Sequence, residues 1–154
     1  MWFNLALIPA LLAIAASATP LASSDVSLEA RNNDKITYLG SKGATLSGGT
    51  KFGNLVFVSG QVPILNGTVV PGGIKNETAF VLARIGDILK EAGTDWSKVL
   101  KTTVLLQDVR DLPAMNEVYA ATVPNPKPAR AAFEVGNLPV FGISVEIEAI
   151  AAIY

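Results

Sequence analysis

Two extended stretches around a Gly-Asn pair predict the first β-hairpin of the chain. Residues 45–52 and 55–59 flank Gly53 and Asn54, two residue types that suit a tight two-residue turn. Every position of residues 55–58 is apolar, which is typical of a strand that is buried on both sides. We therefore expect a hairpin whose second strand is covered on both faces.

A helical period follows the hairpin and predicts the longest helix. Its apolar residues form one stripe that we expect to be buried: Val81, Ile85, Ile88, Leu89 and Ala92. The helix is predicted over residues 76–92, with Asn76 as its N-cap, Glu77 in its first turn and Gly93 at its end. A second helix is predicted to begin near Asp111, because aspartate is a favourable N-cap.

A strand and a stiff loop surround this second helix. Residues 99–107 read as a strand, and regular alternation places Val99 on the same face as Lys101. Residues 124–128 contain three prolines, which disfavour both helix and sheet. The loop is therefore expected to lead directly into the extended segment that carries Arg130.

The predicted order is strand, strand, helix, strand, helix, strand, strand, which indicates an α+β domain. Two helices cannot cover both faces of a sheet of this size, so we expect both on one face. The other face must then be buried by something else, and association of subunits is the economical answer.

The first 35 residues differ from the rest of the chain. Residues 1–18 carry no charged side chain and end in a small-residue pattern, which predicts a secretory signal peptide cleaved after Ala18. The alternatives are a membrane anchor or a wrongly chosen start codon. Residues 19–35 are polar and aperiodic, and read as a flexible linker or pro-segment, or as an arm that packs only in an oligomer. We expect a secreted protein without stable membrane insertion after cleavage.

Composition excludes several kinds of chemistry. The chain has no cysteine and no histidine, which removes thiol nucleophiles, histidine-based triads and Cys/His metal clusters. With 12 basic and 13 acidic residues the formal charge is −1, so no cationic surface for nucleic acid is predicted. Two Asn-x-Thr sequons, at Asn66 and Asn76, are candidate glycosylation sites in an exported protein.

Two charged residues near the C-terminus are the candidates for catalysis. Arg130 offers a planar fork of donors that can grip a carboxylate with two parallel hydrogen bonds. In the last strand, Glu146 and Glu148 share one face and Val145 and Ile147 share the other. Glu146 is a potential proton acceptor. The alternatives are an ion pair at the surface or at a subunit interface for Arg130, and a structural ion pair for Glu146.

A spaced pattern around these residues resembles a known family. Pro128-Ala129-Arg130, Phe133, Gly136, Leu138 and Val145-Glu146-Ile147-Glu148 are similar to the C-terminal signature of the RidA/YjgF family of enamine/imine deaminases. Residues 53–63, 99–104 and 114–119 resemble the same family in the same order.

This resemblance implies a fold and an activity. The fold is a chorismate-mutase-like α+β domain over residues 36–154, with a mixed β-sheet, two helices on one face, and homotrimers whose sites lie between subunits. The activity is hydrolysis of 2-imino or enamine acids to 2-oxo acids and ammonia, without cofactor or metal. Arg130 would bind the substrate carboxylate, and Glu146 would activate the water.

The resemblance also implies four further substrate-binding residues. Ser59 and Gly60 match a Ser-Gly turn that lines the family's pocket, and Asn116 matches an asparagine of its second helix. Ser59 could instead cap its own turn, and Asn116 could satisfy backbone groups. Leu46 replaces the family's usual pocket tyrosine, which makes that wall more apolar.

Two other functions compete with the deaminase prediction. A non-catalytic secreted trimer could use the same cleft to bind a small carboxylate or a host protein, and Leu46 and the leader favour this. Endoribonuclease activity, attributed to some members of the family, is disfavoured by the missing histidines and the net negative charge.

Overall fold

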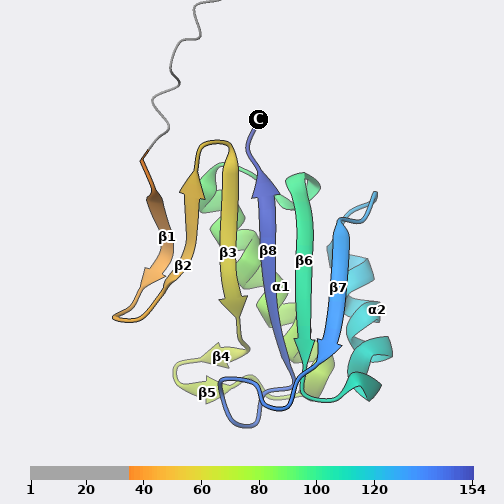
Figure 1. Cartoon of the computed structure of the whole chain (residues 1–154). Helices are drawn as coiled ribbons and strands as arrows, with labels where there is room; N and C mark the ends of the chain where they lie inside the picture. Colours follow the sequence, from red (N-terminus) through yellow and green to blue (C-terminus); the bar gives the residue numbers. More distant parts are fainter. Residues whose placement is uncertain (1–34) are drawn as a thin grey trace, which may run out of the picture. The chain divides into compact units, whose positions relative to one another are not determined.

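The computed structural model describes residues 35–154. The predicted leader and all of the predicted linker except Lys35 lie outside the described residues. Six strands form a mixed sheet, and both long helices pack on one of its faces (Figure 1). No helix in this part of the chain is long and apolar enough to cross a membrane.

The elements follow the predicted order, with a small additional hairpin. The strands are β1 (Thr37–Lys42), β2 (Ser47–Phe52), β3 (Leu55–Gln61), β4 (Ile64–Leu65), β5 (Thr68–Val69), β6 (Val99–Leu106), β7 (Ala129–Glu134) and β8 (Val145–Ala152). The helices are α1 (Gly73–Ala92) and α2 (Leu112–Thr122). The order of the strands in the six-stranded sheet is β1-β2-β3-β8-β6-β7. Neighbouring strands are antiparallel except β6 and β7. These two are parallel because α2 carries the chain back to the end of the sheet at which β6 begins.

The hairpin around Gly53 is confirmed, but one expectation about its second strand is wrong. Gly53 has a φ of 57°, and Phe52 pairs with Leu55 across the turn. On β3, Val56 is fully buried, whereas Leu55 and Phe57 are 39% and 43% exposed. The chain itself therefore covers only one face of this apolar strand.

Helix α1 is confirmed with an earlier start than predicted. Gly72, with a φ of 104°, precedes the helix, because glycine alone makes this sharp entry without strain. Asn76 is therefore not the N-cap, and its amide instead donates to the carbonyl of Pro71 at 3.1 Å. Glu77 lies beyond the first turn and is buried. Gly93, with a φ of 86°, ends the helix as predicted.

A bulge in β6 overturns one prediction about which residues share a face. The pairing register with β8 shifts between Val99 and Lys101, so the alternation is broken at this point. Val99 consequently packs into the core while Lys101 is exposed. The predicted start of the second helix is confirmed, since Asp111 occupies the N-cap position of α2, but the Asp111 side chain makes no capping hydrogen bond.

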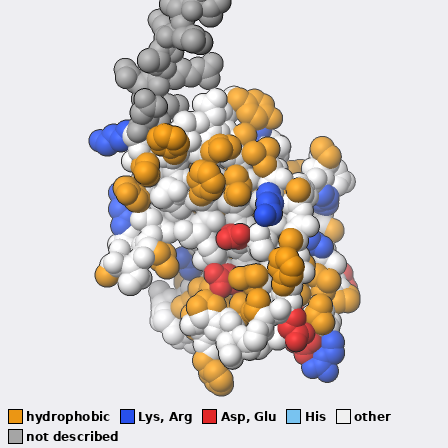
Figure 2. Space-filling model, viewed as in Figure 1, with side chains coloured by type: hydrophobic (Ala, Val, Ile, Leu, Met, Phe, Trp, Pro, Cys, Tyr) orange, Lys and Arg blue, Asp and Glu red, His pale blue; other side chains and the backbone are white. Residues whose placement is uncertain are grey.

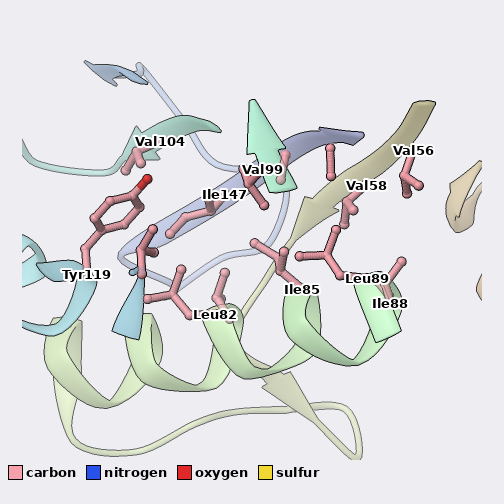
Figure 3. Packing of buried hydrophobic residues seen from close by; sticks show 14 of the residues in the cluster. Val56, Val58, Leu82, Ile85, Ile88, Leu89, Val99, Val104, Tyr119 and Ile147 are labelled. Atoms are coloured by element: carbon pink, nitrogen blue, oxygen red, sulfur yellow. The ribbon is translucent and has the colours of Figure 1, made fainter. Parts of the chain in front are cut away.

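The core lies between the helices and the inner face of the sheet (Figure 3). The predicted stripe on α1 is buried, and it packs against residues of β3, β6 and β8 and against Tyr119 of α2. Burying each such side chain contributes about 1.5–3 kcal/mol. This packing holds the central strands in place, and these strands carry the predicted site residues.

The other face of the sheet stays open within residues 35–154. Cα partners across the sheet place apolar side chains such as Tyr38, Phe57 and Ile150 on this open face. Figure 2 shows it, with hydrophobic side chains spread around a few charged ones. An exposed apolar surface of this kind is typical of a site of association.

Candidate active site

The structure separates the two predicted catalytic residues instead of bringing them together in one chain. Arg130 pairs with Thr102, and Thr102 pairs with Ala149; both partners are buried beneath the helices. Arg130 therefore belongs to the helix-covered side of the sheet. Glu146 alternates with the buried Val145, so its side chain lies on the open face. Within a single subunit the two groups therefore do not face one another.

Arg130 lies on the edge strand β7 and is held by α2. Its Nη1 donates to Oδ1 of Asn116 at 2.7 Å, and its guanidinium lies 4.8 Å from the centre of the Tyr119 ring. The Tyr119 hydroxyl in turn bonds to Oγ1 of Thr102 at 2.8 Å in the core. Arg130 is thus presented in a fixed orientation although it is exposed. Asn116 orients Arg130, a role that the sequence did not predict.

A hollow of about 310 Å³ opens beside this guanidinium, lined by residues of α2, the proline-rich loop and β7. The ammonium of Lys127 donates to the carbonyls of Ala120 and Val123, so it is tied to the end of α2. Neither of the two ion pairs formed within residues 35–154 involves Arg130. Arg130 is therefore the cation available for an anionic ligand at this hollow.

Glu146 lies against a bulge in β3. The register of β3 with β8 shifts between Val58 and Gln61, around Ser59 and Gly60. A Cβ atom added at Gly60 would lie 1.8 Å from Oε1 of Glu146, so only glycine permits this contact. The Oγ of Ser59 donates to the carbonyl of Ser47 on β2 at 2.8 Å, so this hydroxyl bonds to the neighbouring strand and does not cap its own turn.

The surroundings of Glu146 make its carboxylate a stronger base. Burial raises the pKa of Glu146 above its ordinary value, and the negative charge of Glu148 on the same face raises it further. Leu46 is 60% exposed and directly precedes Ser47, the first residue of β2. The open face therefore combines a proton acceptor with apolar surroundings.

Two supporting residues were not predicted, although the sequence contains a signal for each. Tyr119 stands three positions after Asn116, a spacing that places both on one face of a helix. Glu77 stands four positions before Val81, in line with the apolar stripe of α1. A carboxylate in line with such a stripe is a candidate for a buried hydrogen-bonding role.

The two sequon asparagines are exposed in different settings. Asn66, with a φ of 52°, lies in the turn of the hairpin formed by β4 and β5. Asn76 lies in the first turns of α1, where its amide nitrogen is engaged with Pro71. Within residues 35–154, no group of acidic side chains is arranged to hold a metal ion.

Comparisons with known proteins agree with this fold. The family model described as Endoribonuclease L-PSP matches residues 42–153. The 2-iminobutanoate/2-iminopropanoate deaminase of Rattus norvegicus is 46% identical over 98 residues, which cover 62% of this chain and 71% of the rat protein. The mitochondrial protein mmf2 of Schizosaccharomyces pombe is 39% identical over 104 residues, covering 66% of this chain and 82% of the yeast protein.

Solved structures give the same result. The crystal structure of RidA from the Antarctic bacterium Psychrobacter sp. PAMC 21119 matches with a TM-score of 0.69 and 34% identity, over 80% of this chain and all of that one. The crystal structure of yeast Mmf1 matches with a TM-score of 0.73 and 29% identity, over 78% of this chain and all of that one. The chain belongs to the RidA/YjgF family, whose members include imine deaminases.

Proposed function

We propose that this protein hydrolyses 2-imino acids to 2-oxo acids and ammonia, in sites formed between the subunits of a homotrimer. One observation carries the proposal: the chain presents a pre-oriented guanidinium on one side of its sheet and a half-buried carboxylate on the other. The names of several relatives, the rat deaminase among them, support the same reaction.

The two groups have complementary roles in the proposed reaction. Arg130 binds the carboxylate of the 2-iminium acid, which fixes the distance of the C=N carbon from the catalytic carboxylate. Water attacks that carbon, Glu146 accepts a proton from the water, and the C=N electron pair moves to nitrogen. Glu146 then returns the proton to the amino group. The C–N bond breaks as the C=O bond forms, and the hydroxyl proton leaves with ammonia as ammonium.

Assembly is required because Arg130 and Glu146 lie on opposite sides of one subunit. The open face exposes aromatic residues that association would remove from water. A neighbour that placed its β7 edge against this face would bring its Arg130 to Glu146. A homotrimer with three such contacts would hold three equivalent sites.

The first test measures 2-oxo acid and ammonia released from 2-imino acids that an amino-acid oxidase generates in situ. The wild-type protein should accelerate release, and Arg130→Ala should reduce kcat/KM by about 100-fold or more while the trimer mass stays unchanged. Arg110→Ala is the matched control, because Arg110 is exposed and paired with Asp108. Release by wild type at only the uncatalysed rate would contradict the proposal.

Mixed trimers test whether each site takes residues from two subunits. Arg130→Ala and Glu146→Ala subunits are unfolded together, mixed in equal amounts and refolded. If one subunit supplies Arg130 and the next supplies Glu146, about a quarter of the sites in random trimers regain both groups. Recovered activity near that fraction supports intersubunit sites, whereas no gain over the separate variants contradicts them.

A non-catalytic binding protein is the second candidate, and the exposed Leu46 favours it. Leucine cannot donate the hydrogen bond that a tyrosine could, so this exposed position lacks a polar group. Calorimetric binding of a 2-oxo acid, lost in Arg130→Ala and without turnover of the imino acid, would select this function over hydrolysis.

A further inference from the structure

Glu77 is a buried carboxylate that takes no direct part in the proposed reaction. It lies on α1 and is 3% exposed. Its Oε2 accepts a hydrogen bond from the backbone N–H of Ser144 at 2.6 Å, and its Oε1 accepts one from the Ser144 hydroxyl at 3.2 Å. Neither ion pair in residues 35–154 includes it. A carboxylate buried without a cation is costly, so these two bonds carry its stabilisation.

Ser144 is held from both sides at the start of β8. Its carbonyl accepts a hydrogen bond from the backbone N–H of Gln107 at 3.0 Å, directly after β6. Its N–H and hydroxyl are held by Glu77 of α1. Ser144 thus joins the helix layer to the sheet, two residues before Glu146 in the chain.

The sheet alone supports Glu146 from one side only. On β6, Leu105 pairs with Glu146, but the pairing of β8 with β3 ends at Gln61 and Ile147. Glu146 therefore lies beyond the last partner on β3. The connection that precedes β8 buries Leu138 and Ile143 but exposes Phe141 completely. A strand end that is paired on one side only is prone to local opening.

We propose that Glu77 is a positioning residue for Glu146, acting through Ser144. This inference rests on the proposed imine hydrolysis, in which Glu146 must meet water at the C=N carbon. By fixing the first residues of β8, Glu77 keeps the Glu146 carboxylate against Gly60. Because Arg130 binds the substrate carboxylate from the opposite half of the site, loss of Glu77 affects kcat more than KM.

Three variants of the full-length protein separate hydrogen bonding from volume and charge. Glu77→Gln keeps an acceptor for the Ser144 N–H and a donor for its hydroxyl. Glu77→Met keeps the volume but removes the acceptor, and it avoids a buried unpaired charge. Glu77→Asp keeps the charge but shortens the side chain by one methylene group. Glu117→Gln is the control, since Glu117 is an exposed glutamate paired with Lys75.

Two readouts are needed, and the first is kinetic. Glu77→Met should lower kcat by about 10- to 100-fold at nearly unchanged KM, Glu77→Asp should give a smaller loss, and Glu77→Gln should stay within about threefold of wild type. Equal loss in Glu77→Gln and Glu77→Met would overturn the inference. So would wild-type kcat in Glu77→Met, or equal changes in KM and kcat.

The second readout is amide hydrogen exchange in the peptide that spans residues 140–147. Exchange there should accelerate about tenfold or more in Glu77→Met and remain slow in Glu77→Gln and Glu117→Gln. Unchanged exchange in Glu77→Met would overturn the anchoring role even if the enzyme is active. If Glu77→Met does not assemble, Glu77→Asp decides both measurements. An inactive wild type would refute the proposed function alone, because exchange still reports on the anchor.

Discussion

The two faces of the sheet are built from alternating residues of the same strands, yet one chain completes only one of them. The inner face packs beneath α1 and α2 with its polar groups satisfied, as in the pair formed by Thr102 and Tyr119. The open face presents Phe57 and Phe133 to solvent and carries Glu146 and Glu148 among them. The first face is built for stability, and the second has the composition of an interface with chemistry inside it.

This difference explains why the predicted site is divided. Arg130 is oriented by groups of the inner side, so its geometry is set within the subunit. Glu146 is placed on the open side, where burial by a neighbour would strengthen both its basicity and its contact with substrate. In the proposed trimer, folding of each subunit orients Arg130, and association of the subunits places this Arg130 next to Glu146 of a neighbour.

Substitutions at two adjacent residues of β3, Phe57→Asp on the open face and Val56→Ala in the core, test the two faces separately. The first substitution would place a charge in the proposed interface, so Phe57→Asp should give folded monomers and lower the imine hydrolysis rate about 100-fold or more. Val56→Ala leaves a cavity in the core and should cost about 2 kcal/mol of unfolding free energy without changing the assembly. Light scattering, the activity assay and urea unfolding measure these outcomes. A trimeric Phe57→Asp protein would show that the open face serves another purpose.

Gly60→Ala tests how closely Glu146 is packed on the open face. The new Cβ would occupy the position of the Glu146 carboxylate, whose flexible side chain can move away without unfolding the strand. We expect kcat to fall by about 10- to 100-fold and the unfolding midpoint to change little. Gly136→Ala is the matched control, because a Cβ at Gly136 would meet no atom within 4 Å other than those of its chain neighbours. Full activity in Gly60→Ala would remove Glu146 from its proposed role.

The order and type of the elements were predictable because hydrophobic periods report on them directly. The stripe on α1 and the glycine at its end are local signals, and both are confirmed. The start of α1 was not predictable in the same way, since Gly72 uses a backbone conformation that no hydrophobic period reveals. The bulges after Val99 and Val58 are equally hidden, because they arise from pairing with β8.

The sequence named the candidate residues of the site, but it could not show that they lie on different faces of the sheet. Arg130 and Glu146 were identified because they are charged residues within a spaced pattern that resembles the family's C-terminal signature. The face that each one occupies depends on strand neighbours, and the parallel pairing of β7 with β6 puts Arg130 on the inner side. Glu77 and Ser144 are 67 positions apart, so their contact exists only in the folded chain.

Glu148→Gln tests the electrostatic interaction between two glutamates of the open face, and its expected effect is the smallest. Glu148 raises the pKa of Glu146 through its negative charge, as the second cause after burial. Glutamine removes that charge and keeps the size of the side chain. The pKa of Glu146 should therefore fall, with the trimer and the maximal rate retained.

The direction of the resulting pH effect follows from the role of Glu146 as a base. Only the carboxylate form accepts a proton from water, so kcat/KM should rise with pH through the raised pKa of Glu146, and Glu148→Gln should move this rise to lower pH. The raised pKa of Glu146 also affects the free energy of unfolding. The protonated Glu146 carboxyl stabilises the fold at pH values below its ordinary pKa of 4.5, and this contribution is lost as the pH rises through the pKa of the folded state. A pH series of kcat/KM for both proteins measures the shift. An acidic limb that stays in place, or moves to higher pH, would mean that a group other than Glu146 limits the reaction.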